Sequence, residues 1–412
     1  MSFPRYPKYK PSGVEWLGEV PEHWEVVPVW LLFKLGRGRV ISNEEIQDNP
    51  GPFPVYSSQT EGNGEMGKIC SFDFDGDYLT WTTDGANAGT VFRRSGQFNC
   101  TNVCGTLLPN KESAILDYMV HAVGLSKGFY VRHDINPKLM NNVMGKIRVP
   151  KPPKRDQLAI ASFLDHETAK IDALIAEQQR LIELLKEKRQ AVISHAVTKG
   201  LDPTVRMKDS GVEWLGQVPE HWEVGPVKRF FESCDGRRIP LSTEERSYME
   251  GEYPYYGASG IIDFVNDFIF DEDLVLVSED GANLINRSTP VAFVAAGKYW
   301  VNNHAHILRP NDNNLHYWSE RIESVDLIPF VTGSAQPKLT ADALLNLKIA
   351  VPPTENERFQ IQTFFLGRTK EIHDLILEAQ RAIDLLQERR TALISAAVTG
   401  QIDVRGFQPA AA

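Results

Sequence analysis

Arginine and lysine residues stand beside glycine or proline at matching places in the two halves of the sequence. Gly36-Arg37 matches Gly236-Arg237, and Asn136-Pro-Lys-Leu139 matches Gln336-Pro-Lys-Leu339. A glycine lets the backbone approach a polyanion, and a guanidinium supplies a planar fork that fits phosphate or the edge of guanine. These pairs indicate contact with nucleic acid. Surface solubility is the alternative interpretation for the arginines.

Amide and hydroxyl side chains recur in the same way. Tyr56-Ser-Ser-Gln59 matches Tyr256-Gly-Ala-Ser259, and Asp84-Gly-Ala-Asn87 matches Asp280-Gly-Ala-Asn283. Asn and Gln can pair bidentately with adenine, although Asn also caps turns. Each residue alone is a weak signal, and repetition at equivalent places in unlike segments strengthens it. The candidate DNA contacts are Arg37, Arg39, Ser58, Gln59, Lys68, Asn87, Arg93, Arg94, Asn102, Lys138, Arg237, Arg238, Tyr256, Ser259, Asn283, Asn286, Arg287, Asn303, His304 and Lys338.

Catalytic motifs are missing from the sequence. No Gly-Lys-Ser/Thr follows a glycine loop, no HExxH occurs, and no lysine follows an acidic residue by two positions as in common nuclease sites. His304-Ala-His306 and the pair Cys100 and Cys104 each offer half of a metal site. A hydrogen-bonded histidine pair and buried thiols are the better interpretations. The sequence therefore predicts no catalytic residue and no metal or cofactor site in this chain.

Composition limits the class of protein. The chain has 412 residues, and 44 Lys and Arg against 54 Asp and Glu give a net charge of −10. This excludes a protein coated in basic residues but permits a local patch on DNA. With only four cysteines in so long a chain, a disulfide framework is not expected and a reducing cytoplasmic compartment is favoured. No leader pattern is visible and no stretch approaches the ~18 apolar residues of a membrane span, so no membrane partner is expected.

These candidate residues sit within a duplicated frame. Gly13 to Val26 reads GVEWLGEVPEHWEV, and Gly211 to Val224 differs from it at one position in fourteen. Ile160 to Asp202 aligns without gaps with Ile361 to Asp403, and both segments contain Ala-Val-Thr near their ends. A period of about 200 residues exceeds any solenoid repeat and indicates a duplicated domain pair.

Each copy contains one long helix. Apolar residues fall at i, i+3/i+4 and i+7 through both aligned segments, and Pro152-Pro153 or Pro352-Pro353 stands before each. A stripe of roughly 40 residues needs a partner of similar length. We expect the two helices to pair with each other, the alternative being that each packs on its own globular half.

The segments between these matched parts, about 27–149 and 225–351, are of similar length but diverge. Short apolar runs such as Leu274–Val277 and Val291–Val294 predict strands. A nearly identical frame around two divergent inserts is typical of two recognition surfaces that bind different targets. The second insert is acidic and the first nearly neutral, so binding by either alone should be weak and salt-sensitive.

With these features the chain resembles the specificity subunit of type I restriction–modification systems over essentially its whole length. The resemblance rests on the SGVEWLG…VPEHWEV openings at Ser12 and Ser210, the Pro-Pro boundaries and the long helices. It also rests on Tyr255-Tyr-Gly-Ala-Ser-Gly260, Glu279-Asp-Gly-Ala-Asn283 and Trp300-Val-Asn-Asn-His304. The first insert departs from this pattern, with Tyr56-Ser-Ser-Gln and Trp81-Thr-Thr-Asp-Gly.

The resemblance implies an α+β fold with a pseudo-two-fold internal repeat. Two mixed α/β target recognition domains are expected at 1–153 and 201–353. Long helices at 154–200 and 354–401 would form an antiparallel coiled coil, and a tail is expected at 402–412. Each recognition domain would read one half of a bipartite double-stranded DNA target, and the coiled coil would set the separation of the half-sites.

The resemblance also implies partners. Two methyltransferase subunits would dock on the coiled coil and be joined by restriction and translocase subunits. S-adenosylmethionine, ATP and Mg would then belong to those partners, and this chain would be a non-catalytic recognition subunit. Two other interpretations stay open: a specificity subunit that serves a fused methyltransferase–nuclease, and a coiled-coil scaffold that does not bind DNA.

Overall fold

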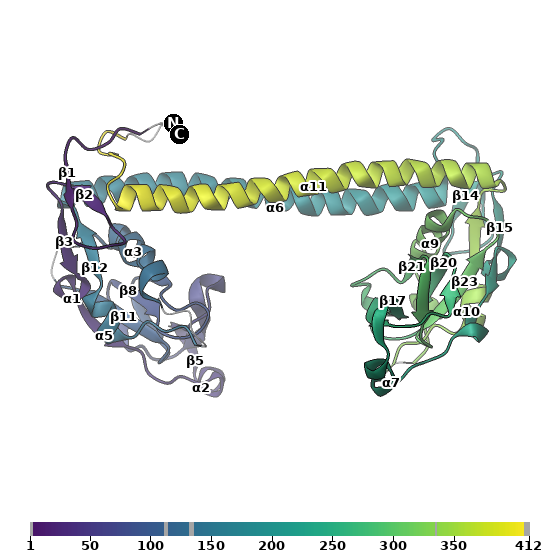
Figure 1. The fold of residues 1–412 in the computed structure, drawn as a ribbon, viewed down its shortest axis with the longest axis horizontal. Coiled ribbons are helices and arrows are strands. Elements are labelled where there is room, and N and C mark those ends of the chain that lie inside the picture. The colour runs from purple at the N-terminus through teal and green to yellow at the C-terminus, as the bar shows by residue number, and fades with distance from the viewer. Residues whose placement is uncertain (1–2, 111–113, 132–135, 334–335, 408–412) are drawn as a thin grey trace. The chain divides into compact units, whose positions relative to one another are not determined.

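The structure is a computed structural model that describes residues 3–110, 114–131, 136–333 and 336–407. Its contacts divide the chain into unit 1, Met1–Gln178 with Arg381–Ala412, and unit 2, Gln179–Gln380 (Figure 1). Each long helix therefore belongs partly to both units. Part of the predicted tail, 408–412, lies outside the described residues, as do 1–2, 111–113 and 132–135 of the first recognition domain and 334–335 of the second.

Unit 1 alternates short strands with short helices before the first long helix. Its elements are β1 (Tyr9–Pro11), β2 (Glu19–Pro21), β3 (Glu25–Pro28), α1 (Val29–Leu32), β4 (Phe33–Arg37), α2 (Asn43–Asp48), β5 (Pro50–Tyr56), η1 (Glu61–Gly64), β6 (Glu65–Ile69), β7 (Phe74–Asp75), β8 (Tyr78–Thr82), β9 (Val91–Arg94), β10 (Gln97–Cys100), β11 (Cys104–Pro109), α3 (Leu116–Leu125), α4 (Lys127–Tyr130), α5 (Asn141–Lys146), β12 (Arg148–Lys151) and α6 (Lys154–Lys199), which continues into unit 2.

Unit 2 repeats this order. Its elements are β13 (Met207–Asp209), β14 (Gln217–Pro219), β15 (Glu223–Pro226), η2 (Val227–Arg229), β16 (Phe231–Ser233), η3 (Asp235–Arg237), α7 (Thr243–Tyr248), β17 (Glu250–Gly257), β18 (Gly260–Val265), β19 (Phe270–Asp271), β20 (Leu274–Ser278), α8 (Asn283–Asn286), β21 (Ala292–Ala295), β22 (Lys298–Val301), β23 (Ala305–Pro310), α9 (Leu315–Glu323), η4 (Ile328–Phe330), α10 (Ala341–Asn346), β24 (Lys348–Val351) and α11 (Glu355–Val398), which returns into unit 1.

The sheets of the two units have the same topology. Unit 1 contains four-stranded sheets of order β6-β5-β10-β7 and β4-β11-β8-β9, and unit 2 contains β18-β17-β22-β19 and β16-β23-β20-β21. The parallel pairs also correspond, because β5 runs parallel to β10 and β17 runs parallel to β22. Inserts with little sequence likeness therefore fold alike, which confirms the predicted duplicated α+β fold.

Both ends of each insert meet in a two-stranded antiparallel sheet. In unit 1, β3 pairs with β12 and Val27 faces Val149. In unit 2, β15 pairs with β24 and Gly225 faces Ile349. The chain thus enters and leaves each insert at neighbouring points on the frame.

The long helices begin after proline pairs and end at glycines. Helix α6 starts two residues after Pro152, and α11 starts two residues after Pro353. Gly200 and Gly400 follow with φ of +80° and +76°, a left-handed conformation that an L side chain strains to adopt. The backbone itself therefore stops both helices, at places that differ by one position in the alignment of the two copies.

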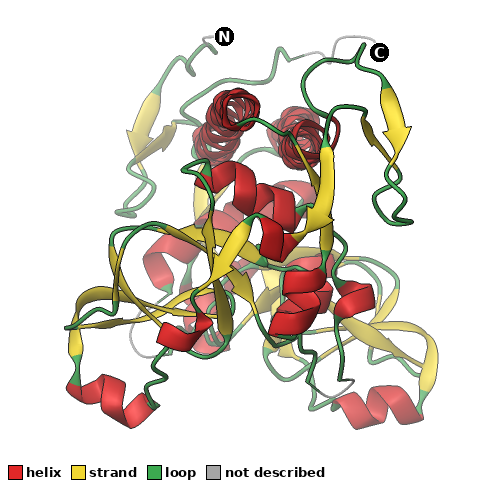
Figure 2. Ribbon diagram, turned by 90° about the vertical axis from the view of Figure 1, so that its right-hand side faces the viewer, coloured by secondary structure: helices red, strands yellow, loops and turns green. Residues whose placement is uncertain are grey.

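Within each unit the two long-helix segments pack together along their apolar faces. In unit 1, Ile160 shares a buried cluster with Val398, and Arg390 forms an ion pair with Asp172 at 2.9 Å. The α6 numbers rise as the α11 numbers fall, so these segments run antiparallel. In unit 2, Val197 and Ile361 share a buried cluster, and Figure 2 shows the two helix segments side by side above the strands.

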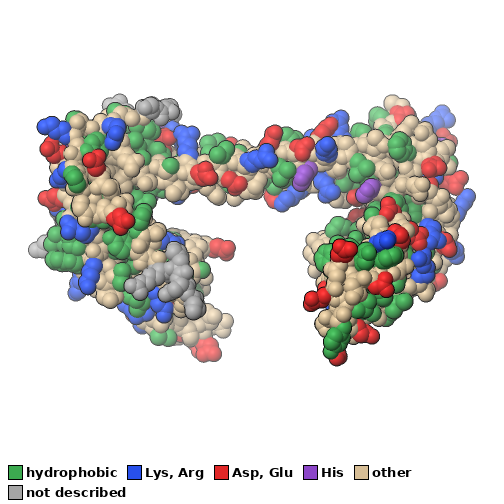
Figure 3. Space-filling view, in the orientation of Figure 1, with side chains coloured by type: hydrophobic (Ala, Val, Ile, Leu, Met, Phe, Trp, Pro, Cys, Tyr) green, Lys and Arg blue, Asp and Glu red, His purple; other side chains and the backbone are tan. Residues whose placement is uncertain are grey.

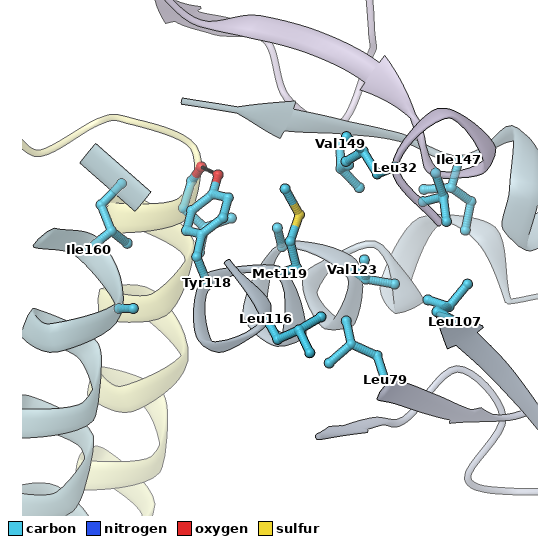
Figure 4. Packing of buried hydrophobic residues seen from close by; sticks show 14 of the residues in the cluster. Leu32, Leu79, Leu107, Leu116, Tyr118, Met119, Val123, Ile147, Val149 and Ile160 are labelled. Atoms are coloured by element: carbon cyan, nitrogen blue, oxygen red, sulfur yellow. Dashed lines mark hydrogen bonds between the residues drawn. The ribbon is translucent and has the colours of Figure 1, made fainter. Parts of the chain in front are cut away.

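The core of unit 1 joins its sheet to the long helices through α3. Figure 4 shows Val123 and Leu116 directed toward Leu79 and Leu107 of the sheet, while Tyr118 lies toward the long helices. The Tyr118 hydroxyl lies 3.1 Å from the carbonyl oxygen of Pro150. Full burial of such apolar side chains contributes about 1.5–3 kcal/mol each. Helix α3 therefore anchors the recognition insert to the frame.

Within the described parts of the chain, no helix is apolar over enough length to cross a bilayer.

Candidate nucleic-acid interface

Three loops of unit 2 are hydrogen-bonded to one another at the ends of β20, β22 and the segment before α10. The Glu279 amide donates to the His304 carbonyl at 2.9 Å, and the Gly281 amide donates to the Pro337 carbonyl at 3.0 Å. The Leu339 amide closes the set with a 2.8 Å bond to the Glu279 carbonyl. Residues 279–283, 302–304 and 336–339 therefore form one surface, which we name the loop platform of unit 2.

Unit 1 builds the same platform from residues 83–87, 101–103 and 136–139. The Thr83 amide donates to the Val103 carbonyl at 2.8 Å, and the Gly85 amide donates to the Pro137 carbonyl at 3.0 Å. The Leu139 amide donates to the Thr83 carbonyl at 2.9 Å. The two platforms match bond for bond, and the structure thus brings together Asn87, Asn102 and Lys138 as it does their counterparts.

Ion pairs cover the platform of unit 2. Arg238 lies 2.6 Å and Lys338 3.0 Å from the carboxylate of Glu279, and His304 lies 2.8 Å from Asp280. Burial opposes ionisation of Glu279, but the hydrogen bonds from Arg238 and Lys338 prevail and lower its pKa. Arg238 is only 16% exposed, so it supports the loops from beneath, whereas Lys338 and His304 remain half-exposed.

A buried histidine ties this network to the sheet. The Nδ1 atom of His306 lies 2.7 Å from Asp235, and its Nε2 atom lies 2.8 Å from the Leu339 carbonyl. Because both ring nitrogens face acceptors, the doubly protonated imidazolium fits this site. Burial alone would lower the pKa of His306, but these hydrogen bonds outweigh it and raise the pKa. The pKa of Asp235 is lowered because its bonds to His306 and the Ile307 amide overcome burial.

The other two candidate arginines of unit 2, Arg237 and Arg287, also have acidic partners. Arg237 bonds to Glu272 at 2.6 Å and stacks 4.3 Å above the Phe270 ring, but stays 46% exposed. Arg287 has a left-handed φ of 46° and lies 2.7 Å from the Glu323 carbonyl. Instead of the glycine-flanked loop expected from sequence, Arg237 ends the short helix η3. Of the two arginines, Arg237 is the better placed to reach DNA.

Most candidate cations of unit 1 have partners within the unit. Arg37 donates to the Asn102 carbonyl at 2.7 Å, and Arg39 lies 2.6 Å from Glu45. The remaining pairs are Arg93 with Asp117, Lys138 with Asp84 at 3.6 Å and Lys68 with Glu65 at 3.8 Å. Exposed pairs of this kind contribute at most about 1 kcal/mol, so a phosphate could replace the carboxylate at small cost. Figure 3 shows acidic and basic side chains interspersed on the visible faces.

Arg94 differs from these cations because it is only 3% exposed. Its guanidinium lies 3.6 Å above the Tyr56 ring, and its Nε donates to Thr80 at 3.2 Å. Burial lowers its pKa. In this arrangement Arg94 has no surface to offer DNA, and it supports the Tyr56 loop instead.

The amides divide into structural and accessible groups. Asn87 donates to the Ser58 carbonyl at 3.1 Å, and buried Asn283 donates to the Thr289 carbonyl at 3.0 Å. Both bonds hold loops. Asn102 and Asn303 are exposed at equivalent platform positions, where their side chains can meet a base edge.

The remaining candidates border the platforms. Asn286 accepts from the Ser288 amide at 3.3 Å, Gln59 donates to the Glu65 carbonyl, and Tyr256 stacks on Phe293 with ring centroids 5.9 Å apart. Ser58 is half-buried and Ser259 is exposed. Stacking and hairpin geometry therefore hold several of these side chains, while Ser259 stays accessible.

In the residues that the structure describes, neither the pair His304 and His306 nor the pair Cys100 and Cys104 is completed to a metal site. No three His, Cys, Asp or Glu side chains there are placed to hold a metal ion. Cys100, Cys104 and Cys234 are buried free thiols, and Cys70 is an exposed one. Each of His304 and His306 bonds to its own aspartate. These side chains are used in packing and hydrogen bonding.

Sequence reasoning missed the acidic partners. Glu272 bonds to Arg237 from 35 positions away, and Glu279 bonds to Arg238 from 41 positions away. Asp235, three positions before Arg238, lies 3.6 Å from it. The excess of acidic residues in the second insert was the one signal that could have indicated such pairing.

The chain matches, twice, the family described as the type I restriction modification DNA specificity domain, over residues 21–184 and 219–388. These stretches cover more than half of the chain, so the protein belongs to this family.

Named relatives agree with this assignment. The N-terminus of a type I specificity subunit from Mycoplasma pneumoniae is 48% identical over 130 residues, which are 31% of this chain and 70% of that protein. The specificity subunit of a type I restriction enzyme from Methanocaldococcus jannaschii is 24% identical over 426 residues, covering 94% of this chain and 95% of that protein. Six further Mycoplasma pneumoniae relatives are matched over only 35–59% of their own length.

A solved chain from a type I restriction–modification system shares the fold. It aligns with a TM-score of 0.61 at 14% identity, over 92% of this chain and 98% of the solved chain. The protein is thus a specificity-type subunit of two repeated recognition domains.

Proposed function

We propose that this chain reads a bipartite double-stranded DNA target, one half with each loop platform. The observation that carries the proposal is that the two platforms have the same backbone hydrogen bonds but differ at several side chains, among them Thr83 against Glu279 and Val103 against His304. A common backbone places the readers in the same way, and divergent side chains let each platform recognise its own bases. Asn102 with Asn303 and Lys138 with Lys338 are alike in the two platforms and would contact DNA in the same way. Arg237 borders the platform of unit 2, where the half-exposed His304 also replaces Val103.

The two long helices would serve as a spacer between the half-sites. The antiparallel contact of α6 and α11 within unit 1 supports a continuous antiparallel coiled coil. Rigid helices would fix the separation of the half-sites, and two half-sites on one face of DNA lie about one helical turn apart, ~34–36 Å.

The same helices would bind two copies of a methyltransferase subunit. Apolar side chains reach the surface along them (Figure 3), at positions related by the duplication: Leu158 with Phe359, Leu174 with Leu375, and Leu184 with Leu385. Two identical partners need two equivalent surfaces, and exposed apolar side chains at repeated positions supply them.

Catalysis would belong to the partners. We expect S-adenosylmethionine on the methyltransferase subunits, and ATP with Mg on restriction and translocase subunits. The purified chain should therefore neither methylate nor cleave DNA.

The test is to express the chain with the methyltransferase subunit from the same genome and to sequence the methylated sites. A two-block target with an unread gap is expected. Unchanged methylation after both inserts are replaced would favour the scaffold interpretation. Methylation by the purified chain alone would contradict the non-catalytic role, and a single partner that both methylates and cleaves would identify a fused enzyme.

A further inference from the structure

In unit 1 the N-terminal segment closes the end of the long helices with two aromatic side chains. Tyr6 is buried, with its ring centroid 5.6 Å from those of both His23 and Trp24. Phe3 packs edge-on against Phe163 of α6 at 5.1 Å, which leaves Phe163 fully buried. Both rings therefore cover the frame at the start of α6.

The C-terminal segment holds this arrangement in place. The Asp403 amide donates to the Pro4 carbonyl at 2.7 Å, and the Arg405 guanidinium lies 4.8 Å above the Tyr6 ring. Phe407 also packs edge-on against Phe163, with ring centroids 4.9 Å apart. Unit 1 thus supplies its own aromatic cover from both chain ends.

Unit 2 has the same frame without the aromatic cover. The linker 201–206 stands where unit 1 has its two terminal segments, with Leu201 in place of Phe3 and Thr204 in place of Tyr6. A cavity of about 250 Å³ opens beside it, lined among others by Lys199, Pro219, His221, Trp222, Glu357 and Ile361. His221 and Trp222 are the repeat counterparts of the residues that enclose Tyr6.

A second aromatic position is also uncovered in unit 2. Phe364 is the counterpart of Phe163, and it is 40% exposed where Phe163 is fully buried. In unit 1 the rings that occupy these two places lie three residues apart in one segment, Phe3 and Tyr6, and three extended residues span ~10 Å. The exposed ring and the cavity therefore correspond to the two contacts of a single extended segment.

The cavity suits one ring better than a larger ligand. Its volume lies below the ~300–1,000 Å³ of most small-molecule sites. Its polar wall is already ordered, because Glu357 accepts from Trp222 Nε1 at 2.9 Å and lies 3.0 Å from His221. In unit 1, Asp156 makes the matching bond to His23 at 2.9 Å, and Tyr6 packs beside that pair.

We propose that the cavity of unit 2 and Phe364 receive two aromatic side chains, three residues apart, from an extended segment of a partner protein. A second copy of this chain is disfavoured as the source. Phe3 and Tyr6 of such a copy are already packed in its own unit 1. Releasing them would expose Phe163 and the place beside His23 and Trp24 that Tyr6 occupies. The proposal does not depend on DNA recognition, and it makes unit 1 and unit 2 unequal toward partners.

The probe is a peptide with the sequence of residues 3–10, Phe-Pro-Arg-Tyr-Pro-Lys-Tyr-Lys, added to the full chain. Binding is followed by fluorine NMR of the chain labelled with 5-fluorotryptophan, with the Trp222 and Trp24 signals assigned from Trp222→Phe and Trp24→Phe variants. We expect a saturable shift of the Trp222 signal, and at least tenfold weaker binding when the first two aromatic residues of the peptide are alanine.

The matched variants change the linker. Leu201→Phe with Thr204→Tyr gives unit 2 the aromatic residues of unit 1 and should block peptide binding, whereas Leu201→Ala with Thr204→Ala should leave it intact. Both positions are exposed, so folding should persist, and thermal unfolding checks this. A Trp222 signal that never shifts, equal binding of the alanine peptide, or equal binding by the two linker variants would each overturn the proposal. So would self-association through this site, detected by light scattering and lost in the Phe/Tyr variant.

Discussion

Each recognition domain has an equivalent buried carbonyl, that of Leu139 or Leu339. The residue that donates a hydrogen bond to it differs between the domains and comes from a different one of two paired strands. In unit 1, Trp81 Nε1 donates to the Leu139 carbonyl at 2.8 Å, and its ring covers Gly105, where a Cβ would come within 2.2 Å. In unit 2 the place of Gly105 is taken by His306, whose Nε2 bonds to the Leu339 carbonyl at 2.8 Å. The backbone of the platform is thus kept, while a neutral indole donor in unit 1 is exchanged for an ion-paired imidazole in unit 2.

This exchange accounts for part of the charge difference between the inserts. Residues 27–149 contain 12 Lys and Arg against 12 Asp and Glu, and residues 225–351 contain 11 against 18. Part of the extra acid, Asp235 and Glu279, neutralises His306, Arg238 and Lys338 inside the fold. The charge of an insert therefore reflects its internal support as well as its attraction for DNA, so net charge alone is a poor guide to which domain binds more tightly.

Replacing one insert by the other should have the largest effect. We expect a chain with residues 27–149 in place of 225–349 to fold, because both inserts join the frame through paired strands of the same register, with Val27 facing Val149 and Gly225 facing Ile349. The assembled methyltransferase should then modify a target with two identical, inverted half-sites. Sequencing of methylated sites checks this, and the unaltered chain is the control. A target that keeps the original second half-site would show that the frame takes part in reading bases.

Lengthening a long helix should change the gap and leave both half-sites unchanged. One added turn between Thr198 and Asp202 extends the chain by ~5.4 Å, against a rise of ~3.4 Å per base pair. We expect the gap to change by one or two base pairs, measured by sequencing methylated sites. Insertion of the same residues in the exposed linker between Asp202 and Arg206 is the control. New bases at an unchanged gap would show that the helices do not measure distance.

Arg237 and Arg238 should separate a DNA contact from a structural one. Arg238→Ala leaves the largely buried Glu279 without its closest partner, and breaking such a pair costs about 3 kcal/mol of folding free energy. Arg237→Ala should cost under ~1 kcal/mol of stability, yet weaken DNA binding of the assembled complex by ~1–3 kcal/mol. Denaturant unfolding and DNA titration measure the two effects. Equal losses of stability in the two variants would contradict the assignment of Arg238 as structural and Arg237 as a DNA contact. Unchanged DNA affinity in Arg237→Ala would mean that Arg237 serves surface solubility.

The smallest expected effect is a pH dependence that unit 2 owes to His306 and its acidic partners. The pKa of His306 is raised above its usual 6.5, so its pairing stabilises the fold fully below that pH and is lost as pH rises through the raised pKa. The pKa values of Asp235 and Glu279 are lowered from 3.8 and 4.5, so their contribution is present above those values and is lost as pH falls. Together these groups contribute most to the folding stability of unit 2 between about pH 5 and 6.5.

The His306→Asn variant isolates this effect. The difference in melting temperature between the natural chain and the variant should narrow as pH rises above 6.5, because the histidine loses its charge as pH passes through its raised pKa. Unit 1 carries Gly105 at the same place and offers no such group. A difference that stays constant with pH would mean that His306 is neutral in the fold.

The sequence by itself determined the duplication, the long helices and several strands, because these follow from local periodicity. The apolar run Leu274–Val277 lies in β20, and the prolines and glycines that bound α6 and α11 act on their immediate neighbours. His304 and His306, which the sequence predicts to be hydrogen-bonded, bond to Asp280 and Asp235.

Only the tertiary structure decided which candidate residues are accessible. Arg237 and Arg238 are neighbours in the sequence, as are Arg93 and Arg94. In each pair the first arginine is half-exposed and the second is enclosed by the fold. The aromatic cover of Phe163 and its absence at Phe364 likewise depend on chain ends far away in sequence. The physical reason is that burial and ion pairing depend on which distant segments the sheets and helices bring together, whereas periodicity and backbone conformation depend on neighbours along the chain.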